Sequence, residues 1–128
     1  MTLSQYFEKA KGFGVLATAD AEGKVNTAIY ISPLFLDKDD ATACSFIMGN
    51  RLTHDNLKHN PSASYLFIEQ GDRYAGKRLS LIVGQEECDN PEKIKAIRRR
   101  LDLPLGDEEC KYLVHFHIEG VRPLIGNG

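Results

Sequence analysis

Residues 13–32 constrain the fold most, because two runs of strand-forming residues flank a turn that is too short for a crossover. The first run is Gly-Val-Leu-Ala-Thr-Ala, the turn is Asp20–Gly23, and the second run begins at Val25. Glycine at the end of the turn accepts a positive φ without steric cost. The pattern predicts an antiparallel β-hairpin and disfavours a parallel sheet, whose connections need a dozen or more residues.

In the second arm of this hairpin, an apolar set of residues alternates with a more polar set. The apolar set is Val25, Thr27, Ile29 and Ile31, and the residues between them are Asn26, Ala28, Tyr30 and Ser32. Since successive side chains point to opposite faces of a strand, we expect the apolar set to face the core. Pro33 cannot donate to a ladder, so the strand bends or becomes an edge there.

The rest of the chain consists of similar short apolar runs separated by turn residues. They predict strands at 43–48, 63–68, 78–86 and 111–118, and helices at 2–11, 53–60 and 91–101. Only one connection between strands, 89–110, holds a full-length helix. The sequence therefore predicts a mainly β fold, an antiparallel six-stranded, closed or partly closed barrel of Greek-key type with short flanking α-helices.

Length and composition indicate one soluble domain over residues 1–128. A net charge of -2 provides no positive field for phosphodiesters, so we expect no nucleic acid partner. No apolar run approaches the ~20 residues that cross a bilayer, and the start of the chain lacks a secretory signal pattern, so we expect no membrane partner and a cytoplasmic location.

The chain has three cysteines, Cys44, Cys88 and Cys110, which are odd in number and far apart in sequence. This pattern is typical of reduced, buried thiols.

The segment from Arg51 to Pro61 contains the strongest chemical signal. Thr53 is placed as the N-cap of a short helix, with Leu52 and Leu57 spaced as a hydrophobic staple. A guanidinium and a hydroxyl at the start of a helix, where free N–H groups favour anions, form a candidate phosphate site. The alternative is that Thr53 only caps the helix while Arg51 is solvated.

Together with the hairpin, this segment resembles the pyridoxamine 5'-phosphate oxidase-like, FMN-binding split-barrel family. The similar pieces are the start of the hairpin at Gly14, the Asn26-Thr27 pair, the helix from Thr53 to Pro61, and the strand Arg78-Leu-Ser-Leu-Ile-Val-Gly84. The resemblance extends over about residues 5–87. It implies a split β-barrel that forms a homodimer, with FMN bound in each of two clefts between the protomers.

The resemblance also implies a set of cofactor-binding residues. Arg51 and Thr53 would hold the FMN phosphate. The flavin ring would lie along Val25, Asn26, Thr27 and Ala28, above Ile47, Met48, Gly49 and Asn50. These residue types suit a flavin, which needs an apolar surface against its ring, polar groups at the ring edge and an anion-binding group at its phosphate.

Two departures from the family pattern affect the expected chemistry. The family often has an Arg-Lys pair where this chain has Leu52 and Thr53, so the phosphate would have fewer cations, and a partner-chain group, Lys77 or Arg78 would compensate. The chain contains no tryptophan, and hence no Trp-containing C-terminal signature of the vitamin B6 oxidases. Pyridoxamine phosphate is therefore not the expected substrate.

The expected function is that of an FMN-dependent oxidoreductase or electron-transfer protein. One alternative is a module that binds FMN without catalysis, and another is a relative that binds haem or a deazaflavin, for which His54, His115 and His117 would be relevant. Tyr30, Tyr74 and His54 are the only acid–base candidates, and a packing role is the simpler reading of each. No metal site is expected, because His115 and His117 alone are too few ligands.

Overall fold

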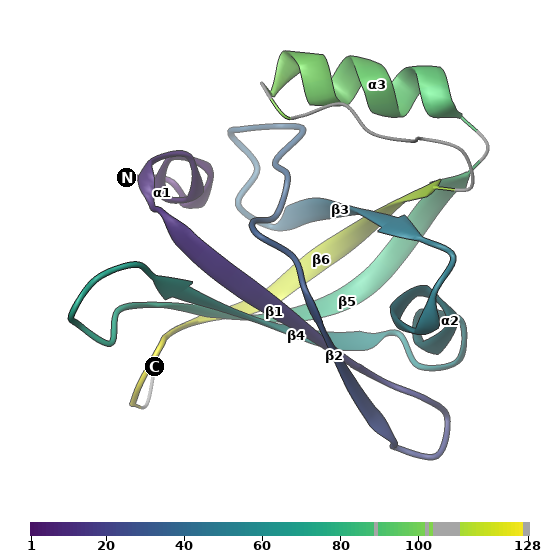
Figure 1. Cartoon of the computed structure of the whole chain (residues 1–128), viewed down its shortest axis with the longest axis horizontal. Helices are drawn as coiled ribbons and strands as arrows, with labels where there is room; N and C mark the ends of the chain where they lie inside the picture. The colour runs from purple at the N-terminus through teal and green to yellow at the C-terminus, as the bar shows by residue number, and fades with distance from the viewer. Residues whose placement is uncertain (89, 102, 104–110, 127–128) are drawn as a thin grey trace.

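The computed structural model describes residues 1–88, 90–101, 103 and 111–126, and within these it contains three helices and six strands (Figure 1). In chain order the elements are α1 (Leu3–Lys9), β1 (Gly12–Ala19), β2 (Val25–Ile29), β3 (Ala43–Gly49), α2 (Leu52–His59), β4 (Ser62–Glu69), β5 (Gly76–Cys88), α3 (Pro91–Arg100) and β6 (Lys111–Pro123).

The six strands form one antiparallel sheet in the order β2-β1-β4-β5-β6-β3. The sheet curls into a half-barrel, and α2 contacts β1, β2 and β3 near the two edges of the sheet (Figure 1). Beyond β2, Leu34 pairs with Ser45 of β3 through two backbone hydrogen bonds of 2.8 Å. The two edges are thus joined at one point, and the predicted six-stranded split barrel is confirmed.

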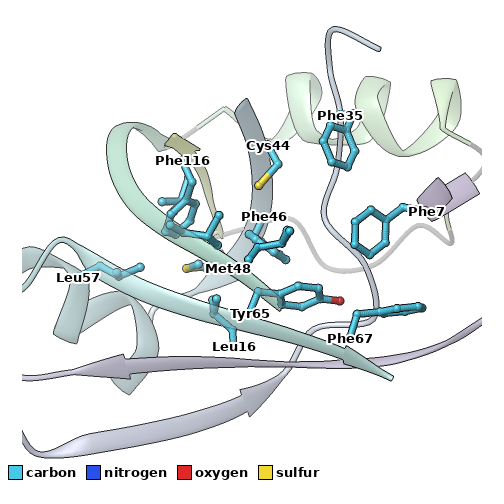
Figure 2. Packing of buried hydrophobic residues seen from close by; sticks show 13 residues of the cluster. Phe7, Leu16, Phe35, Cys44, Phe46, Met48, Leu57, Tyr65, Phe67 and Phe116 are labelled. Atoms are coloured by element: carbon cyan, nitrogen blue, oxygen red, sulfur yellow. The ribbon is translucent and has the colours of Figure 1, made fainter. Parts of the chain in front are cut away.

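One apolar core fills the curl of the sheet (Figure 2). Its aromatic members pack at angles, as Phe46 does against Tyr65 and Phe116 at ring distances of 5.3 and 5.7 Å. The fully buried Tyr65 donates its hydroxyl to the carbonyl oxygens of Tyr30 and Ile31. These contacts fix the end of β2 to the centre of the core.

Side-chain caps and a turn glycine define the ends of several elements, and the positive φ expected in the β1–β2 turn is confirmed. Thr2 and Gln5 form a reciprocal capping box on α1. In the β1–β2 turn, Gly23 has a φ of +88°. Asn90 accepts a hydrogen bond from the backbone N–H of Lys93, and Pro91 is the first residue of α3. The strand β6 extends beyond its predicted end, to Pro123.

The faces of β2 are opposite to the prediction. Asn26 and Ala28 pair with the buried residues Thr18 and Leu16, so they share the inner face, and the ring of Tyr30 packs on Phe46 at 5.5 Å. The apolar set is exposed instead, with Val25, Ile29 and Ile31 each about two-thirds accessible. Alternation shows which side chains share a face, whereas the register with β1 decides which face is covered.

The cysteines also differ from one another. Cys44 is buried in the core, and burial raises the pKa of its thiol to about 12. Cys88 is exposed, so the expectation of burial was wrong for it, and Cys110 lies outside the described residues. Among the helices that the structure describes, none is long and apolar enough to cross a membrane.

Candidate functional site

The start of α2 differs from the prediction in its cap. The helix begins at Leu52 with Arg51 in the N-cap position, and Thr53 is the second helical residue. The carbonyl of Arg51 accepts the first helical bond, from Asp55, because the chain turns directly out of β3 at Gly49. Within the described chain, no side chain caps this helix, so its first N–H groups remain available to an anion.

The expected staple between Leu52 and Leu57 is also absent from the described structure. Leu57 is buried in the core, whereas the side chain of Leu52 is 55% exposed. With Arg51 as the N-cap, Leu52 becomes the first helical residue rather than the residue before the cap, and it cannot take the staple position. It therefore contributes neither packing nor charge at the start of α2.

Thr53 is buried and connects α2 to β2. Its Oγ1 accepts a hydrogen bond of 3.3 Å from Nδ2 of Asn26. One turn later, Nδ2 of the buried Asn56 donates to Oγ1 of Thr18 at 3.1 Å. Nothing in the sequence connects Asn56 with Thr18, because their contact depends on where α2 lies across the hairpin. The two bonds hold α2 against the β1–β2 hairpin, one through β2 and the other through β1.

Arg51 is exposed and stands beside a second cation that the sequence did not indicate. In the β3–β6 ladder, Gly49 is paired with Lys111. A Cβ built on Gly49 would lie 3.7 Å from Nζ of Lys111 and 3.9 Å from Nε of Arg51. Glycine therefore leaves an open space between a guanidinium and an ammonium group. Arg51 also acts on Tyr30, whose pKa is raised by burial and partly lowered again by the guanidinium.

The other predicted ring-binding residues fall on different surfaces. Ala28 shares the inner face with Asn26, whereas Val25 and Thr27 point outward and are exposed. Ile47 is half-buried and Asn50 is exposed. The side chain of Met48 is buried in the core, so only the backbone of Met48 could contact a ligand.

Lys77 is not near the start of α2 within one protomer. It lies at the first end of β5, paired with Phe67 and Pro123, whereas α2 leads into the opposite end of β4. Its ammonium group stands 4.5 Å above the ring of Tyr6. A role for Lys77 at the phosphate would therefore have to come from a second protomer.

Two of the histidines are held by carboxylates. The ring of His54 is buried, stacks on Tyr112 at 3.7 Å, and its Nε2 lies 2.6 Å from Glu86, while its Nδ1 has no hydrogen-bond partner within the described residues. His115 joins Oγ of Ser45 through Nδ1 at 2.6 Å and Glu87 through Nε2 at 2.8 Å.

Two further candidates from the sequence lie on the surface: His117, considered for haem or metal, and the acid–base candidate Tyr74. His117 and Tyr74 are exposed, with Tyr74 85% accessible. In the part of the chain that the structure describes, no three His, Cys, Asp or Glu side chains are grouped as metal ligands. Of the three acid–base candidates, Tyr30 is the one whose pKa, raised by burial, is partly lowered again by Arg51.

Comparisons with known proteins agree with this architecture. No family model matches the sequence, and no curated protein matches it. Solved structures do match, among them an FMN-binding protein from Syntrophomonas wolfei, with a TM-score of 0.76, 17% identity, and coverage of 98% of this chain and 85% of that one.

Two further structures extend the comparison. An F420 reductase has a TM-score of 0.70 at 16% identity, covering 92% of this chain and 94% of that one. A candidate pyridoxamine 5'-phosphate oxidase from Lactobacillus delbrueckii has a TM-score of 0.65 at 16% identity, with 93% and 88% covered. The chain thus has the fold of the pyridoxamine 5'-phosphate oxidase-like, FMN-binding split-barrel proteins.

Proposed function

We propose that this protein binds FMN, with the phosphate at the start of α2 and the flavin ring along the inner edge of β2. The observation that carries the proposal is the hydrogen bond between Asn26 and Thr53 beside the exposed Arg51. It brings an anion-binding helix start together with a strand that offers an amide. A flavin mononucleotide needs both features, an anion site for its phosphate and a polar group at the edge of its ring.

The residues present suit the chemistry of this cofactor. The guanidinium of Arg51 and the uncapped N–H groups of α2 donate to phosphate oxygens, and the space that a side chain at Gly49 would fill leaves room for them. The amide of Asn26 can donate and accept, as the polar edge of a flavin requires. When bound, FMN supplies hydride or electron transfer, and the protein orients it and forms hydrogen bonds to its edge.

A homodimer is part of this proposal, because a single protomer leaves the expected ring site open on one side. The outward face of β1 and β2 carries the exposed apolar residues Phe13, Val25 and Ile29. Edge strands with exposed apolar side chains are normally covered, since they otherwise promote aggregation. A second copy of the chain on this face would cover these apolar side chains, and in such a dimer the cofactor cleft would receive residues of both protomers.

The similar structures support a flavin-type cofactor, since one is described as an FMN-binding protein and another as an F420 reductase. Of the three histidines considered for haem, two are engaged by carboxylates and the third, His117, is exposed on β6. Nε2 of His54 and Nε2 of His115 are both hydrogen-bonded to carboxylates, which leaves neither free for an axial position. An oxidoreductase with a substrate pocket and a module that only carries electrons remain two forms of the same proposal, which steady-state assays with different electron donors would separate.

Titration of the purified protein with FMN tests the proposal directly. Arg51→Ala is expected to weaken FMN binding by about 1.5 to 3 kcal/mol, the value of a charge-assisted hydrogen bond, which is about a 10- to 150-fold rise in Kd. Arg73→Ala removes an exposed arginine from the 70–75 loop and serves as the control, with an unchanged Kd. Failure of the wild-type protein to bind FMN would refute the proposal, and a haem spectrum from the purified protein would replace FMN with haem.

A further inference from the structure

The pairing of Gly49 with Lys111 places two cations around one open point. Nζ of Lys111 and Nε of Arg51 both lie within 4 Å of the position that a Cβ on Gly49 would occupy. Among the described residues, neither charged group has a carboxylate partner within ion-pair distance. Two like charges near each other repel, so an anion that contacts both of them stabilises this arrangement.

The number of charges indicates what kind of anion fits. A terminal phosphate monoester carries nearly two negative charges at neutral pH, because its second pKa is about 6. A phosphodiester carries one negative charge, and a carboxylate also carries one. Two converging cations therefore match a monoester dianion better than either alternative, and glycine at the centre allows its oxygens to approach both groups.

We propose that Lys111 is the second phosphate-binding cation and that, with Arg51, it makes the site selective for a terminal phosphate monoester. The inference rests on the proposed function, and it deepens that function by selecting a flavin with a terminal phosphate monoester, as in FMN, over one whose tail carries a single negative charge or none. Lys111 supplies from β6 the positive charge that the exposed Leu52 does not supply from α2. It acts on the tail of the ligand and not on the flavin ring.

The experiment compares ligands that share the ring and differ in the tail. FMN and riboflavin are each titrated into the wild-type protein, Lys111→Ala and Lys111→Arg, with Lys58→Ala as the control. Lys58 is an exposed lysine in the last turn of α2, so its replacement changes the net charge equally at the far end of the same helix. Circular dichroism of each variant verifies folding.

Lys111→Ala is expected to raise the Kd for FMN about 10- to 100-fold and to leave the Kd for riboflavin within about twofold of the wild-type value. Lys111→Arg and Lys58→Ala are expected to retain FMN binding. An unchanged FMN affinity in Lys111→Ala, or an equal loss for FMN and riboflavin, overturns the role of Lys111 while FMN binding itself stands. A wild-type protein that binds no FMN overturns both the proposed function and this inference.

Discussion

Replacing Gly14 with alanine is the sharpest test of the packing that holds β2 in place. A Cβ at this position would lie 1.9 Å from Oη and 2.2 Å from Cζ of Tyr65. Tyr65 has no exposed surface, and its hydroxyl donates to the carbonyls of Tyr30 and Ile31. Because the ring is enclosed by Phe7 and Phe46, it cannot move aside without disturbing the core.

The magnitude follows from the contacts that must change. Overpacking of a dense core costs about 1 to 3 kcal/mol, and loss of the tyrosine hydrogen bond costs about another 0.5 to 1.5 kcal/mol. Replacing glycine restricts the unfolded chain and recovers about 0.4 to 1 kcal/mol. We therefore expect Gly14→Ala to lower the free energy of unfolding by about 0.5 to 4 kcal/mol.

Urea denaturation monitored by circular dichroism measures this value. Gly120→Ala is the matched control, because its Cβ would meet nothing closer than the Ser80 side chain at 4.0 Å. The double variant Gly14→Ala/Tyr65→Phe removes the hydroxyl but keeps Cζ of the ring in conflict, so it should recover little stability. If Gly14→Ala proves as stable as Gly120→Ala, the packing around Tyr65 is not as described.

Two further changes test the oligomeric state and the ion pairs of Glu87 with Lys93 and His115. Ile29→Glu places a charge on the exposed apolar face of β2 and should convert the proposed dimer to a monomer in sedimentation velocity. Tyr74→Glu, at an exposed position in the 70–75 loop, should leave the dimer intact. A dimeric Ile29→Glu variant or a monomeric wild-type protein would contradict the proposed interface. The hydrogen bonds from Lys93 and then from His115 lower the pKa of Glu87, so its contribution to stability is full above the ordinary glutamate range and is lost as the pH falls through the lowered pKa. The free energy of unfolding of the wild type should exceed that of Glu87→Gln by no more than about 1 kcal/mol near neutral pH, and the two values should converge in acid. A stability difference that grows in acid would contradict this direction.

The fold was predictable because its signals are local. The β1–β2 hairpin follows from the Asp20–Gly23 turn and the alternation around it, and α3 follows from Asn90 and Pro91. Each of these features depends on residues a few positions apart. The antiparallel pairing of β1 with β2 and of β4 with β5 then follows from their short connections, whereas the other three pairs join strands that are distant in the chain or separated by α3.

The faces of β2 were not predictable from the same alternation. Val25 and Ile29 share a face in any register, but only pairing with Leu16 and Thr18 of β1 shows that this face is the outer one. An apolar pattern indicates burial in the assembled protein, which includes any partner. In one protomer, the half-polar set around Asn26 is the inner one because α2 supplies hydrogen-bonding groups to it.

The composition of the phosphate site was partly predictable for a different reason. Arg51 and Thr53 are neighbours in sequence, so their proximity needed no knowledge of the fold. Lys111 lies sixty residues after Arg51, and a lysine at the start of a strand has no distinguishing pattern. Its position beside Arg51 comes only from the register of β3 and β6, in which Gly49 is the residue opposite.

This register also explains how the site can tolerate an uncharged residue at the start of α2. Leu52 stands where the resemblance to the family leads us to expect a cation, and its side chain is exposed without a charge. A strand neighbour can supply that charge only where the intervening residue is small, because a larger side chain at Gly49 would occupy the space between Lys111 and Arg51. Under the proposed function, Gly49 and Lys111 act together, because the glycine provides access and the lysine provides the second charge.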